Sequence, residues 1–241
     1  MPTRLGEYTQ RVVERTQAKM PPQENTIDPR IAAAEVMFGN VASSIGQRYH
    51  KCSFRNFEAN TKPQLSARSQ VEQFGKSAAR HVLNGKNLFL FGPPGTGKDH
   101  LLVATFRMLC LDALNLDVEP RKFRVHWTTG FEMFGAMKHQ IRSNDTTTLD
   151  ACCRAELLVI SDPIPPGHNP KLSDWESSMF WKVIDERYRQ LKPTWVTLNV
   201  TDRKDACARV GAATIDRLAE GACCVHMNWE SYRTTKTKSQ D

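Results

Sequence analysis

The sequence predicts an α/β fold of three layers, in which a parallel sheet lies between helices and carries a phosphate-binding loop. Short apolar segments alternate with longer segments of helical periodicity, which is the pattern of parallel strands covered on both faces. A glycine-rich run, GPPGTGKD at 92–99, follows one apolar segment and opens a helical one. A further apolar segment, 155–160, is followed by Ser161 and Asp162, where P-loop proteins place acidic residues.

The order of elements supports this fold class. Apolar segments at 86–91, 123–128, 155–160, 195–199 and 223–227 are predicted strands, and helical spacing is found at 101–114, 131–141, 174–191 and 214–219. Residues 1–50 read as a separate helical appendage, whose second helix begins at Asp28-Pro29 and stops near Gly39-Asn40. We therefore expect an appendage at 1–50, a nucleotide-binding domain at 51–233 and a disordered polar tail at 234–241.

Composition excludes several classes of protein. The 241 residues are 40% apolar and 24% charged, as in soluble globular proteins. The longest apolar runs, such as 157–160, have four residues, whereas a membrane helix needs about 20, so we expect no membrane segment, no secretory signal and a cytoplasmic location. Seven cysteines without a CxxC or a completing histidine pattern predict reduced thiols and no zinc site. The net charge of +7, mostly from residues 51–154, is compatible with a polyanionic partner.

The 92–99 run matches the GxxxxGK phosphate loop except at its last position, where Asp99 replaces Ser or Thr. Glycines allow backbone N–H groups to surround phosphate oxygens, the helix N-terminus adds positive potential, and Lys98 adds a charge. The predicted cofactors are ATP and Mg²⁺. The predicted cofactor-binding residues are Gly92, Pro93, Pro94, Gly95, Thr96, Gly97, Lys98, Asp99 and His100.

The end of the 155–160 strand allows two registers. In one, Ser161 stands where the metal-side acid is expected and Asp162 takes the second acidic place. In the other, Asp162 is the metal-side acid and Pro163 follows, which leaves no acid to polarise water. The candidate metal ligands are therefore Asp99, Ser161 and Asp162.

The chain resembles the DnaC-type replicative helicase loaders, within the DnaC/IstB branch of the AAA+ ATPases. The resemblance covers about 52–233 and rests on motifs in family order. These are CSFRNF at 52–57, GPPGTGKDHL at 92–101, residues 156–162, IDERY at 184–188, TLN at 197–199, IDRL at 215–218 and NWESYR at 228–233. It implies an AAA+ core with little or no helical lid.

The resemblance also implies catalytic roles, beside Asp162, for three polar residues. Asn199 matches the sensor 1 position, although a strand-end turn residue is the alternative. Arg217 matches an arginine finger offered to ATP on a neighbouring subunit, with a surface pairing to Asp216 or Glu220 as the alternative. Arg233 matches a sensor 2 arginine. A finger acting on a neighbour implies self-association through Arg217.

In this family, the helix after the second strand contacts single-stranded DNA. Here that helix carries Lys138, His139 and Arg142, with Phe131 and Phe134 as rings that could stack on bases. The alternative is that one or both rings belong to the core. The family grips a hexameric replicative helicase through its N-terminal helices. Residues 1–50, with Tyr8, Val12 and Phe38, are the predicted surface unless these side chains pack on their own domain.

Asp99 and Ser161 depart from the usual motifs in complementary ways: Asp99 is an acid where a hydroxyl is usual, and Ser161 is a hydroxyl where an acid is expected. Because carboxylates bind Mg²⁺ well, we expect the two positions to have exchanged roles, with Asp99 supplying the charge and Ser161 the hydroxyl. The competing interpretation is loss of hydrolysis.

Three functions follow in order of preference: a helicase loader with slow ATP hydrolysis, an IstB-like transposition helper ATPase, and a hydrolysis-deficient ATP-sensing adaptor.

Overall fold

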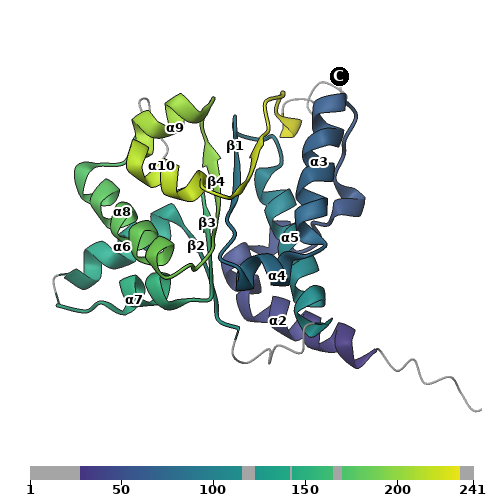
Figure 1. The fold of residues 1–241 in the computed structure, drawn as a ribbon, viewed down its shortest axis with the longest axis horizontal. Coiled ribbons are helices and arrows are strands. Elements are labelled where there is room, and N and C mark those ends of the chain that lie inside the picture. Colours follow the sequence, from purple (N-terminus) through teal and green to yellow (C-terminus); the bar gives the residue numbers. More distant parts are fainter. Residues whose placement is uncertain (1–27, 116–122, 142, 165–169, 234–241) are drawn as a thin grey trace, which may run out of the picture.

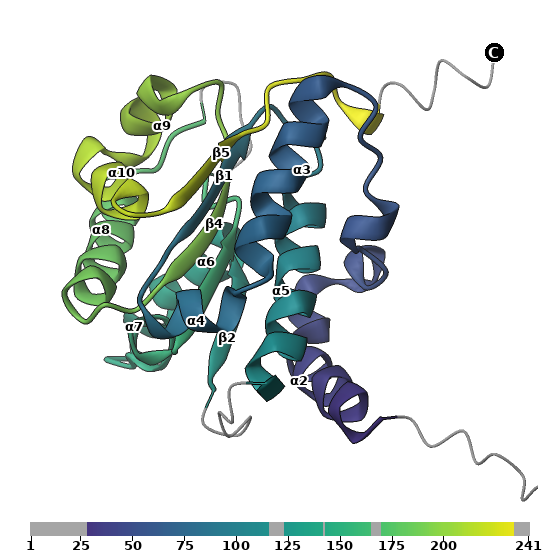
Figure 2. The same ribbon diagram turned by 45° about the vertical axis from the view of Figure 1, so that its right-hand side comes forward.

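Five parallel strands form the central sheet of the computed structural model, which describes residues 28–115, 123–141, 143–164 and 170–233 (Figures 1 and 2). The strands are β1 (Leu88–Gly92), β2 (Val125–Thr129), β3 (Leu157–Ser161), β4 (Thr194–Asn199) and β5 (Cys223–His226). Their order is β2-β3-β4-β1-β5, and every neighbouring pair is parallel. The predicted parallel sheet between helices is confirmed.

One face of the sheet is covered by α2 (Pro29–Ile45), α3 (Lys62–Gly75), α4 (Ala78–Leu83) and α5 (Lys98–Asn115). The other face is covered by α6 (Gly130–Ile141), α7 (Thr147–Arg154), α8 (Asp174–Arg189), α9 (Arg203–Val210) and α10 (Ala212–Ala219). Alternate residues of the strands supply the two cores: Leu88 and Leu90 face the first and Phe89 the second. Two short 3-10 turns, Gln47–Tyr49 and Phe54–Asn56, lead from α2 towards α3.

The predicted end of α2 at Gly39-Asn40 is wrong, because the helix continues to Ile45. Gly39 and Asn40 lie on its exposed side, while Phe38, Val41 and Ile45 continue the buried stripe at helical spacing. Phe38 packs against Phe106 of α5 and is only 6% exposed. It is therefore not part of an accessible helicase-binding surface.

Residues 28–45 share a core with α5 instead of standing apart from the domain. Tyr8 and Val12, with the rest of 1–27, lie outside the described residues, as does the tail at 234–241. The partner-binding role predicted for residues 1–50 stays a prediction.

Candidate nucleotide-binding site

The predicted phosphate loop connects β1 to the first residue of α5. Gly95 and Gly97 have φ values of 82° and 89°, in the region that favours glycine. A Cβ at Gly95 would lie 2.0 Å from Ser231 Oγ, and one at Gly97 would lie 2.7 Å from a ring atom of Phe57. Glycine is thus required here both by conformation and by the close approach of two other segments.

Lys98 is 5% exposed and lies at the start of α5. Its Nζ donates to the carbonyl oxygens of Gly92 at 2.8 Å and Pro93 at 2.7 Å. Burial lowers the pKa of Lys98 to about 8, although Asp99 and Asp162 act in the opposite direction. Its Nζ also lies 3.5 Å from Thr96 Oγ1, so its hydrogen-bond partners within the loop are all neutral, and a phosphate oxygen would make a stronger, charge-assisted bond.

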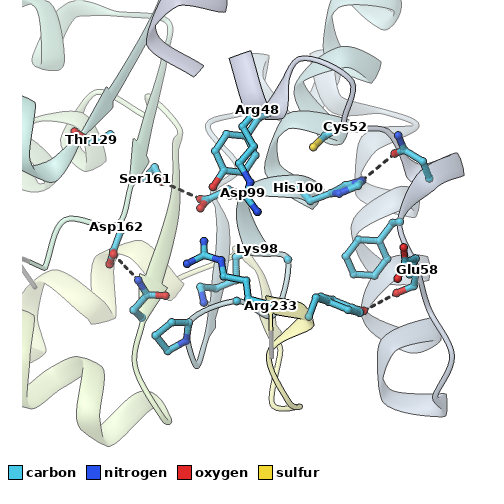
Figure 3. Close-up of a pocket in the computed structure, with 18 of the residues that line it drawn as sticks. Arg48, Cys52, Glu58, Lys98, Asp99, His100, Thr129, Ser161, Asp162 and Arg233 are labelled. Atoms are coloured by element: carbon cyan, nitrogen blue, oxygen red, sulfur yellow. Dashed lines mark hydrogen bonds between the residues drawn. The ribbon is translucent and has the colours of Figure 1, made fainter. Parts of the chain in front are cut away.

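Asp99 is held by hydroxyls from two different strands. Ser161 Oγ of β3 donates to Asp99 Oδ1 at 2.8 Å (Figure 3). Thr197 Oγ1 of β4 donates to the same oxygen at 2.9 Å. Ser161 is therefore the residue that faces the phosphate-loop position normally occupied by a hydroxyl. This geometry is the one expected of the first register, in which Asp162, one place further along, takes the second acidic position.

Asp162 leaves the sheet with a φ of 45°, and its backbone N–H donates to the Thr197 carbonyl at 3.1 Å. Its Oδ2 accepts a hydrogen bond from the amide of Asn199 (Figure 3). Its Oδ1 is buried and has no hydrogen-bond partner within the described part of the chain. Burial, followed by the charge of Asp99, raises the pKa of Asp162. A buried, unpaired carboxylate oxygen calls for a cation, a donor or a water molecule.

These side chains border a cavity of about 650 Å³ at the carboxyl ends of β1, β3 and β4 (Figure 3), a size that accommodates a nucleotide-sized ligand. Tyr49, Cys52, Phe57 and Tyr232 supply aromatic and apolar wall, whereas Arg48 and Arg233 add cations. The terminal NWESYR segment closes this side, because Tyr232 donates through its backbone N–H to the Gly95 carbonyl at 3.0 Å.

His100 lines the cavity, but its Nε2 lies 2.9 Å from the Ser53 carbonyl and 3.1 Å from Asn56 Oδ1. Its ring also meets Phe57 edge to face, with 5.3 Å between centroids. His100 thus lines the cavity and also holds the 53–57 turn to α5. Its contact with the cofactor stays a prediction.

Arg217 does not line the cavity. It lies on α10 and forms an ion pair with Asp185 of α8, at 3.0 Å between Nη2 and Oδ1. The two alternative partners expected from the sequence are wrong: Asp216 pairs with Arg203, and Glu220 accepts a hydrogen bond from the Tyr188 hydroxyl. Asp185 lies on α8, a different helix far away in the sequence, so residue spacing within α10 does not indicate it.

The two phenylalanines of α6 have opposite environments. Phe134 is 4% exposed and packs against the rings of Trp175 and Phe180, which corrects the prediction that it binds DNA. Phe131 is 82% exposed and lies at the edge of the nucleotide cavity. Lys138 and His139 are exposed further along α6, and Arg142 lies outside the described residues.

Sequence reasoning missed Thr197, Arg48 and Tyr49 as site residues. Thr197 lies two residues before Asn199 on β4, so strand alternation places both on one side of the sheet. Arg48 and Tyr49 fall within the predicted appendage, and no motif in the sequence marks them as site residues. In the described residues, no group of three or more His, Cys, Asp or Glu side chains could hold a metal alone, and no described helix is long and apolar enough to cross a membrane.

Comparison with solved structures gives the same fold. The DnaC helicase loader matches with a TM-score of 0.62 and 22% identity, over 77% of this chain and all of that one. DnaI matches at 0.57 and 19%, over 77% and 93%. The replication initiator DnaA bound to AMPPCP and single-stranded DNA matches at 0.55 and 17%, over 81% of this chain and 55% of DnaA.

Comparison of the sequence with curated proteins and with family models identifies a single family. No curated protein sequence matches the chain significantly. The IstB-like ATP binding protein family matches residues 42–241, a range that contains the phosphate loop, the Asp99–Ser161 pair and the Asp162–Asn199 pair. The resemblance expected from the motifs is confirmed, and the chain belongs to the IstB-like ATP-binding protein family.

Proposed function

We propose that this protein is an ATP-binding helicase loader, which delivers or holds a hexameric replicative helicase on single-stranded DNA and hydrolyses ATP slowly with Mg²⁺. The observation that carries the proposal is the position of Phe131. This exposed ring lies at the edge of the nucleotide cavity and at the start of the helix assigned to DNA contact. Bound nucleotide and bound single-stranded DNA can therefore influence each other through the first turn of α6.

The cavity has suitable residues for Mg-ATP. Gly95, Gly97 and Lys98 form a cradle for phosphate, while Asp99, Ser161 and Asp162 would hold the metal. Mg²⁺ is commonly bound by one or two carboxylates together with substrate phosphates. The bound ion would neutralise charge between those carboxylates and the triphosphate. Asp99 Oδ1 is already satisfied by two hydroxyls, so its second oxygen is the one suited to the ion.

Single-stranded DNA would lie along α6. An exposed aromatic ring can stack on a base, and nearby cations can contact phosphates. Phe131, Lys138 and His139 are exposed on this helix, and Arg142 completes the proposed set. The helicase would be held through residues 1–50, and self-association would use Arg217 towards ATP on a neighbouring copy.

Two other functions have specific support. A transposition helper ATPase is favoured by the match to the IstB-like family. An ATP-sensing adaptor that does not hydrolyse is favoured by Asp99 and Ser161, whose side chains occupy each other's usual chemical role.

Pulldown separates the first two functions. The immobilised full-length chain, with ATP and Mg²⁺, is offered a hexameric replicative helicase or a transposase of the IS21 type. Retention of the helicase, with loss on deletion of residues 1–27, supports the loader. Retention of the transposase alone supports the helper, and a Lys98→Ala variant reports whether either contact requires nucleotide.

A further inference from the structure

Two helices end side by side at the edge of the sheet where the strands begin, and Figure 2 shows α4 at this edge. After α4, the N–H groups of Gly85 and Lys86 donate back to carbonyls of the helix at 3.1 and 2.9 Å. After α8, the N–H groups of Leu191 and Lys192 do the same, also at 3.1 and 2.9 Å. Both turns are Schellman motifs. They touch, because a Cβ on Gly85 would lie 2.4 Å from the Leu191 carbonyl oxygen.

Leu191 does not suit its place in the second turn. Its φ is 53°, and that of Gly85 at the equivalent place is 69°. Glycine adopts this conformation at little cost, whereas a leucine is strained in it. Leu191 is also 76% exposed, and Leu83, two residues before Gly85, is 59% exposed. Neither leucine is accounted for by packing in the core, and a strained residue of this kind calls for a functional explanation.

Cations surround the two leucines. Arg80 and Lys86 are exposed, and Lys192 donates through Nζ to the Arg154 carbonyl at 3.0 Å. None of these three cations forms an ion pair with a residue that the structure describes. Burial, followed by the charge of Lys86, lowers the pKa of His81, and Arg80 acts in the same direction, so both cations lie close to that ring. Helix C-termini favour cations, but they do not favour exposed leucines.

We propose that Arg80, Leu83, Lys86, Leu191 and Lys192, called here the leucine face, bind an acidic segment of another protein that also carries apolar side chains. The carboxylates of that segment would meet the three cations, and its apolar side chains would cover the two leucines. None of the five residues lines the nucleotide cavity, which lies at the other end of the strands.

The chain itself does not supply a segment of this chemistry from its two ends. Residues 1–27 contain four basic and three acidic side chains, and residues 234–241 contain two basic and one acidic. Both ends are therefore cationic on balance, as the leucine face is. Charge complementarity thus requires a different molecule as the partner.

Two other kinds of partner fit the leucine face less well. A nucleic-acid backbone is contacted by cationic and polar groups, so both leucines would be left against phosphates. Membrane binding strengthens with the apolar area that is buried, and two leucines offer little. An acidic segment with apolar side chains matches both components of the face at once.

The test is fluorescence anisotropy of labelled helical peptides with the full-length chain, without nucleotide and in about 0.1 M salt. The first peptide has leucines at i, i+3, i+4 and i+7 and glutamates elsewhere. In the second, alanines replace the leucines, and in the third, lysines replace the glutamates. We expect the first peptide to bind at least about tenfold more tightly than either of the others, because only the first has both complementary features.

Leu191→Gly is the most informative variant, because it removes the side chain and suits the turn. It should weaken binding of the first peptide by about fivefold, as expected for partial burial of one leucine, without lowering the midpoint of thermal unfolding. Leu83→Ala should weaken binding similarly, whereas the control Leu65→Ala, at a leucine of α3 that is 51% exposed, should not. Lys86→Gln should weaken binding by about threefold, and the exposed Lys62→Gln should have no effect.

The proposal is overturned if the parent protein binds the first and second peptides equally, or if Leu191→Gly and Leu83→Ala both bind the first peptide as the parent does. Duplex DNA and phosphatidylglycerol vesicles are tested with the same variants. If binding to either of these depends on Leu191 and Lys86 while peptide binding does not, the leucine face has a different partner and the proposal is wrong. The measurement uses no ATP, so its outcome is independent of the proposed loader function.

Discussion

Replacing Lys98 by Met should stabilise the ligand-free protein at pH 7. Burial lowers the pKa of Lys98 from 10.5 to about 8, and a displacement of that size corresponds to about 3 kcal/mol of folding free energy. Met keeps the apolar stem but leaves the carbonyls of Gly92 and Pro93 without their donor, at about 1 kcal/mol each. The net expectation is a gain of about 1 kcal/mol.

The effect of pH has a definite sign. Between pH 8 and 10.5 the unfolded chain retains the Lys98 proton while the folded chain releases it, so the cost of burying the ammonium diminishes as pH rises through this window. The advantage of Lys98→Met should therefore disappear by about pH 9.5.

Urea denaturation of the ligand-free protein at pH 7 and pH 9.5 measures both values. The exposed Lys138→Met is the control for loss of a positive charge, and it should show neither effect. A Lys98→Met variant that is less stable than the parent at pH 7, or whose advantage grows at pH 9.5, would refute the reasoning. The same variant should show no stabilisation by Mg-ATP, because its phosphate contact is gone.

Three further predictions follow from other contacts. Arg187, 1% exposed, donates to the Cys152, Ala155 and Pro193 carbonyls and to the Thr194 hydroxyl, so Arg187→Met should lower the midpoint of thermal unfolding by about 10 °C; an unchanged midpoint in calorimetry would contradict this. Asp99→Thr and Ser161→Asp should each weaken binding of fluorescent Mg-ATP by about tenfold, whereas the double variant should regain most of the affinity; a double variant no tighter than the weaker single would exclude the exchange of roles. Phe131→Ala should reduce affinity for single-stranded DNA by about tenfold in fluorescence anisotropy without changing stability, whereas Phe134→Ala should cost about 3 kcal/mol of stability; the reverse pattern would show that the wrong ring faces DNA.

The sheet could be predicted because its strands are almost continuously apolar. Segments such as 157–160 have no exposed face, so a short apolar run bounded by polar residues identifies them. The phosphate loop could be predicted equally well, because its glycines and Lys98 have a fixed spacing along the chain. In both cases the signal is local, and the tertiary contacts only reinforce it.

The helices were less predictable. α3 begins at a capping box in which Thr61 and Gln64 exchange hydrogen bonds, with Pro63 in the first turn. The helices predicted from apolar spacing do not include it, although its start signal is local. Because a glycine often ends a helix, the sequence predicts that α2 stops near Gly39, whereas the buried stripe through Val41 and Ile45 carries the helix further. Tertiary packing thus overrode the local propensity.

The site depends on contacts between distant positions, and these were only partly visible in the sequence. The pairing of Asp99 with Ser161 was inferred from two complementary departures from one motif, and the structure brings the two side chains to 2.8 Å. No comparable pair of departures from a motif marks Thr197, Arg48 or Asp185, which is the partner of Arg217. Exposure also decided between Phe131 and Phe134, which share the same residue type and the same helix.

The measurement that tests the account most directly is steady-state ATP turnover with Mg²⁺, with and without single-stranded DNA, beside Lys98→Ala. The account predicts slow turnover that single-stranded DNA changes and that Lys98→Ala abolishes, because the P-loop, the Asp99–Ser161 pair and Phe131 border one cavity. Tight binding of ATP with no turnover and no response to single-stranded DNA would contradict it and would favour the ATP-sensing adaptor.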